Sequence, residues 1–246
     1  MIISCNGLTT AGRVKSVNQD AFYFAVTRDK NSGVFVVADG VGGLDFGEIA
    51  SSSAIKETEK WWSGFLNKKS IATTEETVDE LSNLAFRINS EIQKINAEKE
   101  TKSATTFSLL LIIENNYFIV HIGDSRIYAV DKSDNETLNL SQLTRDHSKL
   151  VQREVDGRHI VQNMLTDGLG YKKSINCDCS FGVLNNKIGG FILCSDGVFK
   201  RQSKDVIAKI ISENGCNPEG VCKALAENAM SLGESDNITA MLVNVN

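Results

Sequence analysis

The sequence has a single proline among its 246 residues, and it lacks any run of about eighteen uncharged apolar residues. The missing apolar run excludes a membrane-spanning helix, so we expect no insertion into a membrane. No stretch rich in proline, glycine or serine separates two halves of the chain, and no internal repeat occurs. With 41% apolar residues, the chain is neither disordered nor collagen-like. We therefore expect one domain over residues 1–246.

The six cysteines form neither a disulfide framework nor paired CxxC motifs. The N-terminus, which reads MIISCNGLTTAGR, lacks a charged segment followed by an apolar core and a cleavage site. These absences predict reduced thiols in a cytoplasmic protein.

Basic residues are in the minority, with 26 lysines and arginines against 31 acidic residues and a formal net charge of -5. A protein that coats nucleic acid needs a basic surface, because the phosphate backbone is anionic. We therefore predict no nucleic-acid partner. The acidic balance favours small ligands, metals or proteins instead.

Hydrophobic residues follow two patterns along the chain. Short β-branched or apolar runs predict strands at 22–27, 34–38, 105–113, 117–122, 126–130, 175–183, 190–195 and 238–245. Apolar residues at three- and four-residue steps predict helices at 48–66, 78–95, 204–213 and 219–231. Residues 131–174 are less regular. Because strands and helices come in blocks, the pattern predicts an α+β fold with antiparallel sheet covered by helices.

Four aspartates adjoin predicted strands, in VVADGVGG, HIGDSR, LCSDG and ESDNIT, and a fifth lies in SVNQDAF. They are Asp39, Asp124, Asp196, Asp236 and Asp20. A single Asp-Gly pair is most often a turn. Recurrence beside apolar strands also suits a hard cation such as Mg2+ or Mn2+, because these ions prefer carboxylate and carbonyl oxygens. The residues alone leave both interpretations open.

Seven fragments extend this pattern along the chain, in the order GRVKSVNQDAF, VVADGVGG, SATTFSLLLI, HIGDSRIY, LTRDHS, LCSDGVF and SDNIT. In this order they resemble the successive motifs of the PPM, or type 2C, metal-dependent serine/threonine protein phosphatases, especially the compact bacterial members. The resemblance spans about Gly12 to Thr239. It implies a four-layer sandwich of two packed antiparallel β-sheets flanked by helix pairs, with residues 146–170 as a flap over the active site.

The resemblance also implies a centre for two Mn2+ or Mg2+ ions. Asp39 would bridge both ions, and Gly40 would offer its backbone carbonyl. Asp196 and Asp236 would complete the shell of the first ion. Asp39, Asp196 and Asp236 are therefore the predicted catalytic residues.

Two further aspartates acquire metal roles from the resemblance. Asp20 would hold metal-bound water, and Asp124 would support a third, weaker ion. Two cations can activate a shared water and neutralise the phosphoryl oxygens, which a slow phosphate monoester hydrolysis requires. The predicted reaction is direct attack of that metal-bridging water on phosphoserine and phosphothreonine in proteins. The predicted partners are phosphorylated proteins and an opposing serine/threonine kinase.

Two positions depart from the family pattern. The family usually places an arginine that grips the substrate phosphate five residues before Asp20, where this chain has Lys15. Arg13 would point to the same face if the segment is extended, and could share or replace that grip. Either cation could also be simple surface charge.

The glutamate that often precedes Asp20 is Gln19 here, which removes one negative charge. These departures keep an alternative open, a catalytically weak pseudophosphatase that binds phosphoproteins or regulates them.

Overall fold

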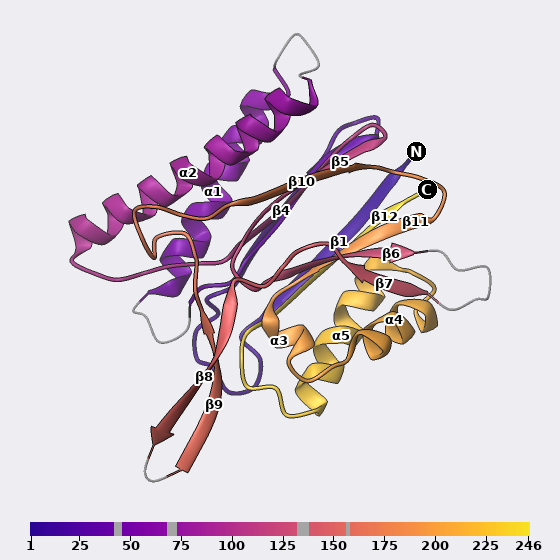
Figure 1. Cartoon of the computed structure of the whole chain (residues 1–246). Helices are drawn as coiled ribbons and strands as arrows, with labels where there is room; N and C mark the ends of the chain where they lie inside the picture. Colours follow the sequence, from indigo (N-terminus) through magenta and orange to yellow (C-terminus); the bar gives the residue numbers. More distant parts are fainter. Residues whose placement is uncertain (42–45, 68–72, 132–137, 156–157) are drawn as a thin grey trace.

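Two five-stranded antiparallel sheets lie face to face between two layers of helices in the computed structural model, which describes residues 1–41, 46–67, 73–131, 138–155 and 158–246 (Figure 1). The first sheet has the spatial order β1 (Ile3–Thr10), β12 (Ile238–Val245), β11 (Ile188–Cys194), β6 (Arg126–Asp131) and β7 (Asn139–Gln142). The second has the order β10 (Asp178–Val183), β5 (Asn116–Ile122), β4 (Phe107–Ile113), β3 (Ser32–Ala38) and β2 (Ala21–Val26).

A pair of helices covers the outer face of each sheet (Figure 1). α1 (Gly47–Phe65) and α2 (Thr74–Lys99) lie on the second sheet, and α4 (Lys204–Glu213) and α5 (Pro218–Ser231) lie on the first. This confirms the predicted α+β class and the four-layer sandwich.

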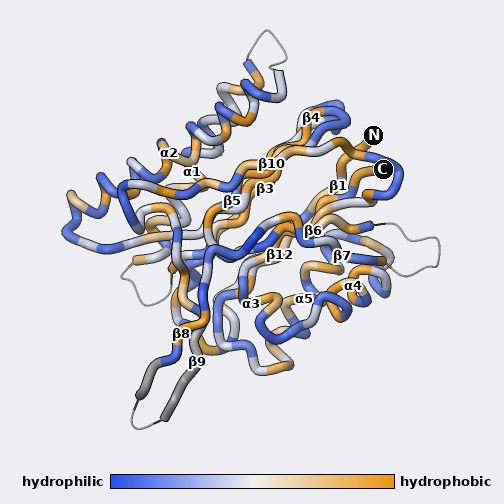
Figure 2. Tube along the Cα trace, in the orientation of Figure 1, coloured by the Kyte–Doolittle hydropathy of each residue, from blue (hydrophilic) through white to orange (hydrophobic). Residues whose placement is uncertain are grey.

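Alternation along β3 shows how the sequence builds three cores. Val34 and Val36 face the helices and pack with α1 and α2, whereas Phe35 and Val37 face the other sheet. Both sides of this strand are buried, so the run is apolar throughout, as the hydropathy colouring of the strands shows (Figure 2). A third core lies between the first sheet and its helices.

Local signals fix where the helices begin. The Thr73 side chain accepts a hydrogen bond from the Glu76 backbone N–H, and the Glu76 carboxylate accepts one from the Thr73 N–H, so the two form a capping box for α2. α5 begins at Pro218, the only proline of the chain, after an Asn217 cap. Among the described residues, no helix is both long and apolar enough to cross a membrane.

The predicted helices and strands are confirmed, but several elements were not predicted. These are β1, β7, the short helix α3 (Asp196–Phe199), and the hairpin of β8 (Ser148–Val155) with β9 (Arg158–Leu165). The expectation of irregular structure over 131–174 was wrong, because this hairpin pairs over its full length away from the main sheets (Figure 1). Its role as a flap, and the description of the chain as one domain, stay predictions.

Candidate metal centre

Asp39 lies at the end of β3, where backbone contacts to the segment before β4 hold it in place. Its N–H donates to the Thr106 hydroxyl at 2.9 Å, and its carbonyl accepts from the Thr106 N–H at 2.8 Å and from the Thr105 hydroxyl at 3.0 Å. The main chain is thus fully bonded, and the carboxylate is left to project from the strand end.

Gly40 follows in a place with no room for a side chain. A Cβ there would lie 2.6 Å from the Gln19 carbonyl oxygen and 2.7 Å from the carbonyl carbon of Gly47. The Gly40 N–H also donates to the Gln19 carbonyl at 3.1 Å. The close approach brings the start of α1 against the end of β3, and this explains the Asp-Gly sequence by packing as well as by turn chemistry.

Asp20 is buried, with 7% of its surface exposed. Its Oδ2 accepts hydrogen bonds from Ser195 Oγ at 2.8 Å and from Thr239 Oγ1 at 2.6 Å, which tie the second sheet to the first. Its Oδ1 is buried and receives no hydrogen bond from the described residues. Burial raises the pKa of Asp20 to about 6, against the effect of the two hydroxyls.

The pKa of Asp39 is raised well above its usual value, first by burial and then by neighbouring carboxylates. The contributing neighbours are Asp20, Asp196, Asp124 and Asp236. The predicted metal-binding aspartates therefore share one electrostatic cluster, although they come from distant parts of the sequence. Such a cluster is costly unless protons or cations neutralise it.

Asp124 enters the cluster from the turn between β5 and β6. The preceding Gly123 has a φ of +112°, and a Cβ there would lie 2.6 Å from Thr106. Burial, followed by the charge of Asp196, raises the pKa of Asp124 to about 7. This carboxyl therefore also favours a proton or a cation near neutral pH.

Lys200 supplies the cation at the other side of the cluster. Its Nζ lies 2.7 Å from Asp196 Oδ2 and 3.0 Å from Asp236 Oδ2. Asp196 opens α3 and Lys200 follows it by one helical turn, so the pairing is local. Burial raises the pKa of Asp196 and Lys200 opposes that shift, whereas at Asp236 Lys200 outweighs burial and the pKa falls below its usual value.

The arrangement contains a carboxylate cluster without a finished three-ligand cage. Among the described residues, no three histidine, cysteine, aspartate or glutamate side chains stand close enough together to hold one ion. Lys200 occupies the space that joins Asp196 to Asp236, so an ion bound by both would have to displace it. The metal-binding roles of Asp20, Asp39 and Gly40 accordingly stay predictions, as do those of the other ligands.

The two predicted phosphate-binding cations differ in position. Lys15 Nζ lies 3.6 Å from Asp236 Oδ1, at the rim of the cluster, with 43% of its side chain exposed. Arg13 is exposed and lies in a turn with Gly12, whose φ is +72°. Arg13 would share the face of Lys15 only in an extended segment, and this condition is not met, because Gly12 packs against the Asp236 carbonyl and turns the chain. The phosphate-binding roles of both residues stay predictions.

The Gln19 side chain pairs with the start of α1. Its Nε2 donates to Glu48 Oε2 at 3.1 Å, in the first turn of α1, while its backbone N–H donates to Asn237 Oδ1 at 2.9 Å. The Glu48 carboxylate therefore places a negative charge beside Gln19, at the position where the family often has a glutamate.

The sequence analysis missed four residues that shape the centre, namely Lys200, Glu48, Ser195 and Thr239. A signal existed for Lys200, since a lysine one turn after an aspartate on a helix start is placed to pair with it. No local signal marked the hydroxyls, because their contacts to Asp20 join segments 175 and 219 residues apart in the chain.

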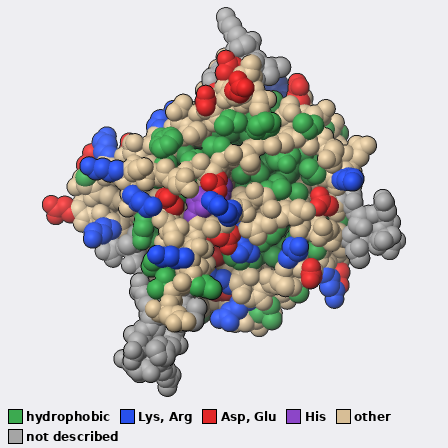
Figure 3. Space-filling model, viewed as in Figure 1, with side chains coloured by type: hydrophobic (Ala, Val, Ile, Leu, Met, Phe, Trp, Pro, Cys, Tyr) green, Lys and Arg blue, Asp and Glu red, His purple; other side chains and the backbone are tan. Residues whose placement is uncertain are grey.

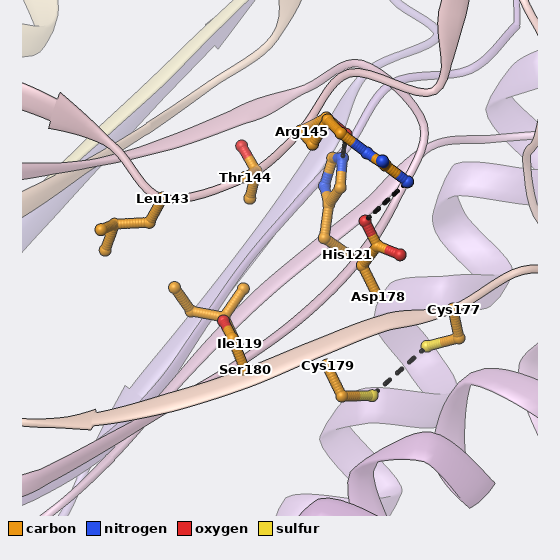
Figure 4. A pocket seen from close by; sticks show the side chains of 9 residues that line it. All are labelled: Ile119, His121, Leu143, Thr144, Arg145, Cys177, Asp178, Cys179 and Ser180. Atoms are coloured by element: carbon orange, nitrogen blue, oxygen red, sulfur yellow. Dashed lines mark hydrogen bonds and ion pairs between the residues drawn. The ribbon is translucent and has the colours of Figure 1, made fainter.

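A separate pocket of about 350 Å³ lies beside β10 and β5 (Figure 4). His121 lines it and is fixed by hydrogen bonds to Ser108 and to the Arg145 carbonyl, and burial lowers its pKa to about 4. Cys177, Asp178 and Cys179 line the same pocket from the start of β10. On the face drawn in Figure 3, acidic and basic side chains are interspersed.

Comparisons with known proteins agree with this architecture. A family model described as protein phosphatase 2C matches residues 9–228. Protein phosphatase PhpP of Streptococcus pneumoniae is 30% identical over 254 residues, which cover 97% of this chain and 96% of that protein. The serine/threonine phosphatase stp of Listeria monocytogenes is 28% identical over 246 residues, covering 96% and 93%. The solved S. agalactiae serine/threonine phosphatase superposes with a TM-score of 0.80 at 25% identity, covering 99% of this chain and all of that one.

Proposed function

The chain belongs to the protein phosphatase 2C family, in its bacterial form, and from this premise we infer that it hydrolyses phosphoserine and phosphothreonine in proteins with the help of divalent cations. Its partners would be phosphorylated proteins and an opposing serine/threonine kinase. The observation that carries the metal dependence is the shared cluster of aspartates around Asp39.

The donors suit a hard cation. All of them are oxygens, which Mg2+ and Mn2+ prefer. The buried Oδ1 of Asp20 receives no hydrogen bond from the described residues, and a cation or a water attached to one would satisfy it. The raised pKa values of Asp20, Asp39 and Asp124 support this proposal, because a proton or a cation would relieve the repulsion between these carboxylates.

We assign the ligands as the family resemblance suggests. Asp39 would hold both ions, Gly40 would offer its backbone carbonyl, and Asp196 and Asp236 would complete the shell of the first ion. Asp20 would orient water from behind. When bound, two Mn2+ or Mg2+ ions would supply an activated water nucleophile and offset the charge of the phosphoryl oxygens.

Asp124 would hold a third, weaker ion at the edge of the centre. Asp124 lies in the turn after β5. The charge of Asp196 adds to the effect of burial in raising the pKa of Asp124, so this residue belongs to the same cluster. Its half-buried position fits a more labile ion.

The substrate phosphate would be gripped at the rim. Lys15 is half-exposed and has its ammonium near Asp236, so it can move to an arriving dianion without leaving the cluster. Arg13 is the second candidate for this contact, since it is exposed and lies two residues before Lys15 in the sequence.

One observation favours a second function. Lys200 already pairs with both Asp196 and Asp236, and an internal ammonium that remained there would hinder the first ion. The chain would then bind phosphoproteins as a weak or silent pseudophosphatase.

The test is hydrolysis of a phosphothreonine peptide with Mn2+, with a chelator, and by Asp196→Asn. We expect turnover only with the ion, and a fall of about a hundredfold or more in kcat for Asp196→Asn. Asp205→Asn, an exposed acid in the first turn of α4, serves as the matched control and should retain activity.

Activity that persists in chelator would contradict the metal mechanism. Binding of the phosphopeptide without turnover under any divalent cation would establish the pseudophosphatase instead.

A further inference from the structure

Two thiols lie in contact at the start of β10. Cys177 Sγ and Cys179 Sγ are 3.8 Å apart, on the side of the strand that faces α2 (Figure 4). Residues two apart in an extended segment point to the same face, which brings these side chains together. Cys179 is exposed and Cys177 is partly buried, so reagents in solution can reach the pair.

The pair differs chemically from the buried cysteines. Burial raises the pKa of Cys194 to about 12 and that of Cys222 to about 11, and it raises the pKa of the partly buried Cys5 to about 11. The hydrogen bond between Cys177 and Cys179 instead lowers the pKa of Cys179 and raises that of Cys177. Because the thiolate is the reactive form and Cys179 is also the more exposed of the two, Cys179 is the favoured nucleophile of the pair.

We propose that Cys177 and Cys179 form a reversible disulfide when the protein meets a hydroperoxide, and that closing this ring displaces the Asp178 carboxylate from His147. The Cys179 thiolate attacks the peroxide, the O–O bond breaks, and a sulfenic acid forms. Cys177 then attacks that sulfur, the S–O bond breaks, and water leaves. In total, two thiols and one hydrogen peroxide give one disulfide and two waters, a two-electron oxidation.

The position in the fold permits this closure but strains it. The sulfurs must approach to about 2.05 Å, and Cα atoms about 6.6 Å apart, as expected two residues apart in a strand, lie near the upper limit for a disulfide. β10 is the end strand of its sheet and, among the described strands, pairs with β5 alone, so its first residues can tighten. Strained disulfides are readily reduced, so the product should be labile.

Asp178 lies between the two cysteines and responds to any tightening there. Its Oδ2 lies 3.0 Å from His147 Nε2. The His147 backbone N–H donates to the Gly123 carbonyl at 2.7 Å, and Gly123 directly precedes Asp124. Displacement of Asp178 would therefore act on His147 and, through the hydrogen bond from His147 to Gly123, on the turn that carries Asp124.

The test uses the full-length reduced protein, hydrogen peroxide and an alkylating reagent, read by peptide mass spectrometry. The peroxide is removed and the protein is unfolded in denaturant before alkylation, so that the buried thiols can react; we then expect the peptide with both cysteines to lose the mass of two hydrogen atoms and to escape alkylation, while the other four of the six cysteines are alkylated. Dithiothreitol should restore alkylation of all six. Cys216→Ser, at another partly exposed thiol, is the control and should keep the response.

Cys177→Ser and Cys179→Ser should each abolish the mass loss. Persistence of the loss in either variant, or preferential oxidation of Cys5 or Cys216, would overturn the site. Imidazole NMR signals of His147 report the second part of the proposal, and a disulfide that leaves them unchanged would overturn the displacement of Asp178.

Discussion

The two sides of the aspartate cluster solve the same electrostatic problem differently. Asp20 is buried, bonded by two neutral hydroxyls, and its pKa rises to about 6. Asp236 is half-exposed, has the ammonium groups of Lys200 and Lys15 at 3.0 and 3.6 Å, and its pKa falls. Residues of one type thus behave oppositely, because hydroxyls only partly offset burial while a cation overcomes it.

This contrast shows where added charge would stabilise the centre. On the Asp20 side a proton or a metal ion would relieve the repulsion between carboxylates. On the Asp236 side an ion must compete with a lysine that is already paired. The following changes remove one side of the contrast at a time.

The largest effect is expected when Asp20 is made neutral in protein kept free of metal by a chelator. Its folded pKa of about 6 exceeds the usual value of 3.8, so between these values the folded state holds a proton that the unfolded state releases. Stability should therefore fall as pH rises from about 4 to about 6, by up to about 3 kcal/mol. Asp39 and Asp124, whose pKa values are also raised, add to the fall, so Asp20→Asn should remove only the contribution of Asp20 and leave a shallower pH profile, as urea unfolding across that range would measure.

Glu227→Gln, an exposed acid on α5, is the control and should leave the pH dependence as it is in the parent protein. An Asp20→Asn protein with the parent's pH profile would show that Asp20 is not the group that holds the proton.

The next effect concerns the cation side. Lys200→Gln removes the ammonium that joins Asp196 to Asp236, so Mn2+ should bind about tenfold more tightly, through lost competition and lost repulsion. Isothermal titration calorimetry measures this directly, with Lys209→Gln on the exposed side of α4 as the matched control. Weaker binding by Lys200→Gln would mean that the lysine positions the carboxylates for the ion.

The smallest effect lies at the rim. Lys15→Arg replaces a point charge by a planar fork, and KM for a phosphothreonine peptide should fall about two- to fivefold. Steady-state kinetics measures this change, with Lys30→Arg as a distant exposed control. An unchanged KM would transfer the phosphate contact to Arg13.

The fold was predictable where one physical signal dominated. The apolar run that ends at Asp39 is buried on both faces, so strand and carboxylate could be placed together. β1 was not predicted, because its sequence, ISCNGLTT, is mostly polar and half-buried. Its pairing with β12 is decided by residues at the far end of the chain. The β8–β9 hairpin was not predicted, because it pairs outside the two main sheets and its sequence has no apolar stripe.

The aspartates of the site could be predicted from the sequence, but the side chains that pair with the site residues could not. Aspartates beside strands carry a visible pattern, whereas the pairing of Gln19 with Glu48 exists only because Gly40 lets α1 approach β3. The position of Arg13 could not be predicted either, because it depends on the backbone conformation of Gly12, which has a φ of +72°.

The order of strands in the first sheet also bears on synthesis. β12 follows both β1 and β11 in the sequence, so it is synthesised after them, yet it lies between these two strands in the sheet. Asp236 and Thr239 are synthesised with it, so a nascent chain that stops before β12 lacks both an inner strand of the sheet and part of the cluster. The pairing of β1 with β12 and the contact of Thr239 with Asp20 are therefore completed in the same step, and a chain truncated before β12 would lack both.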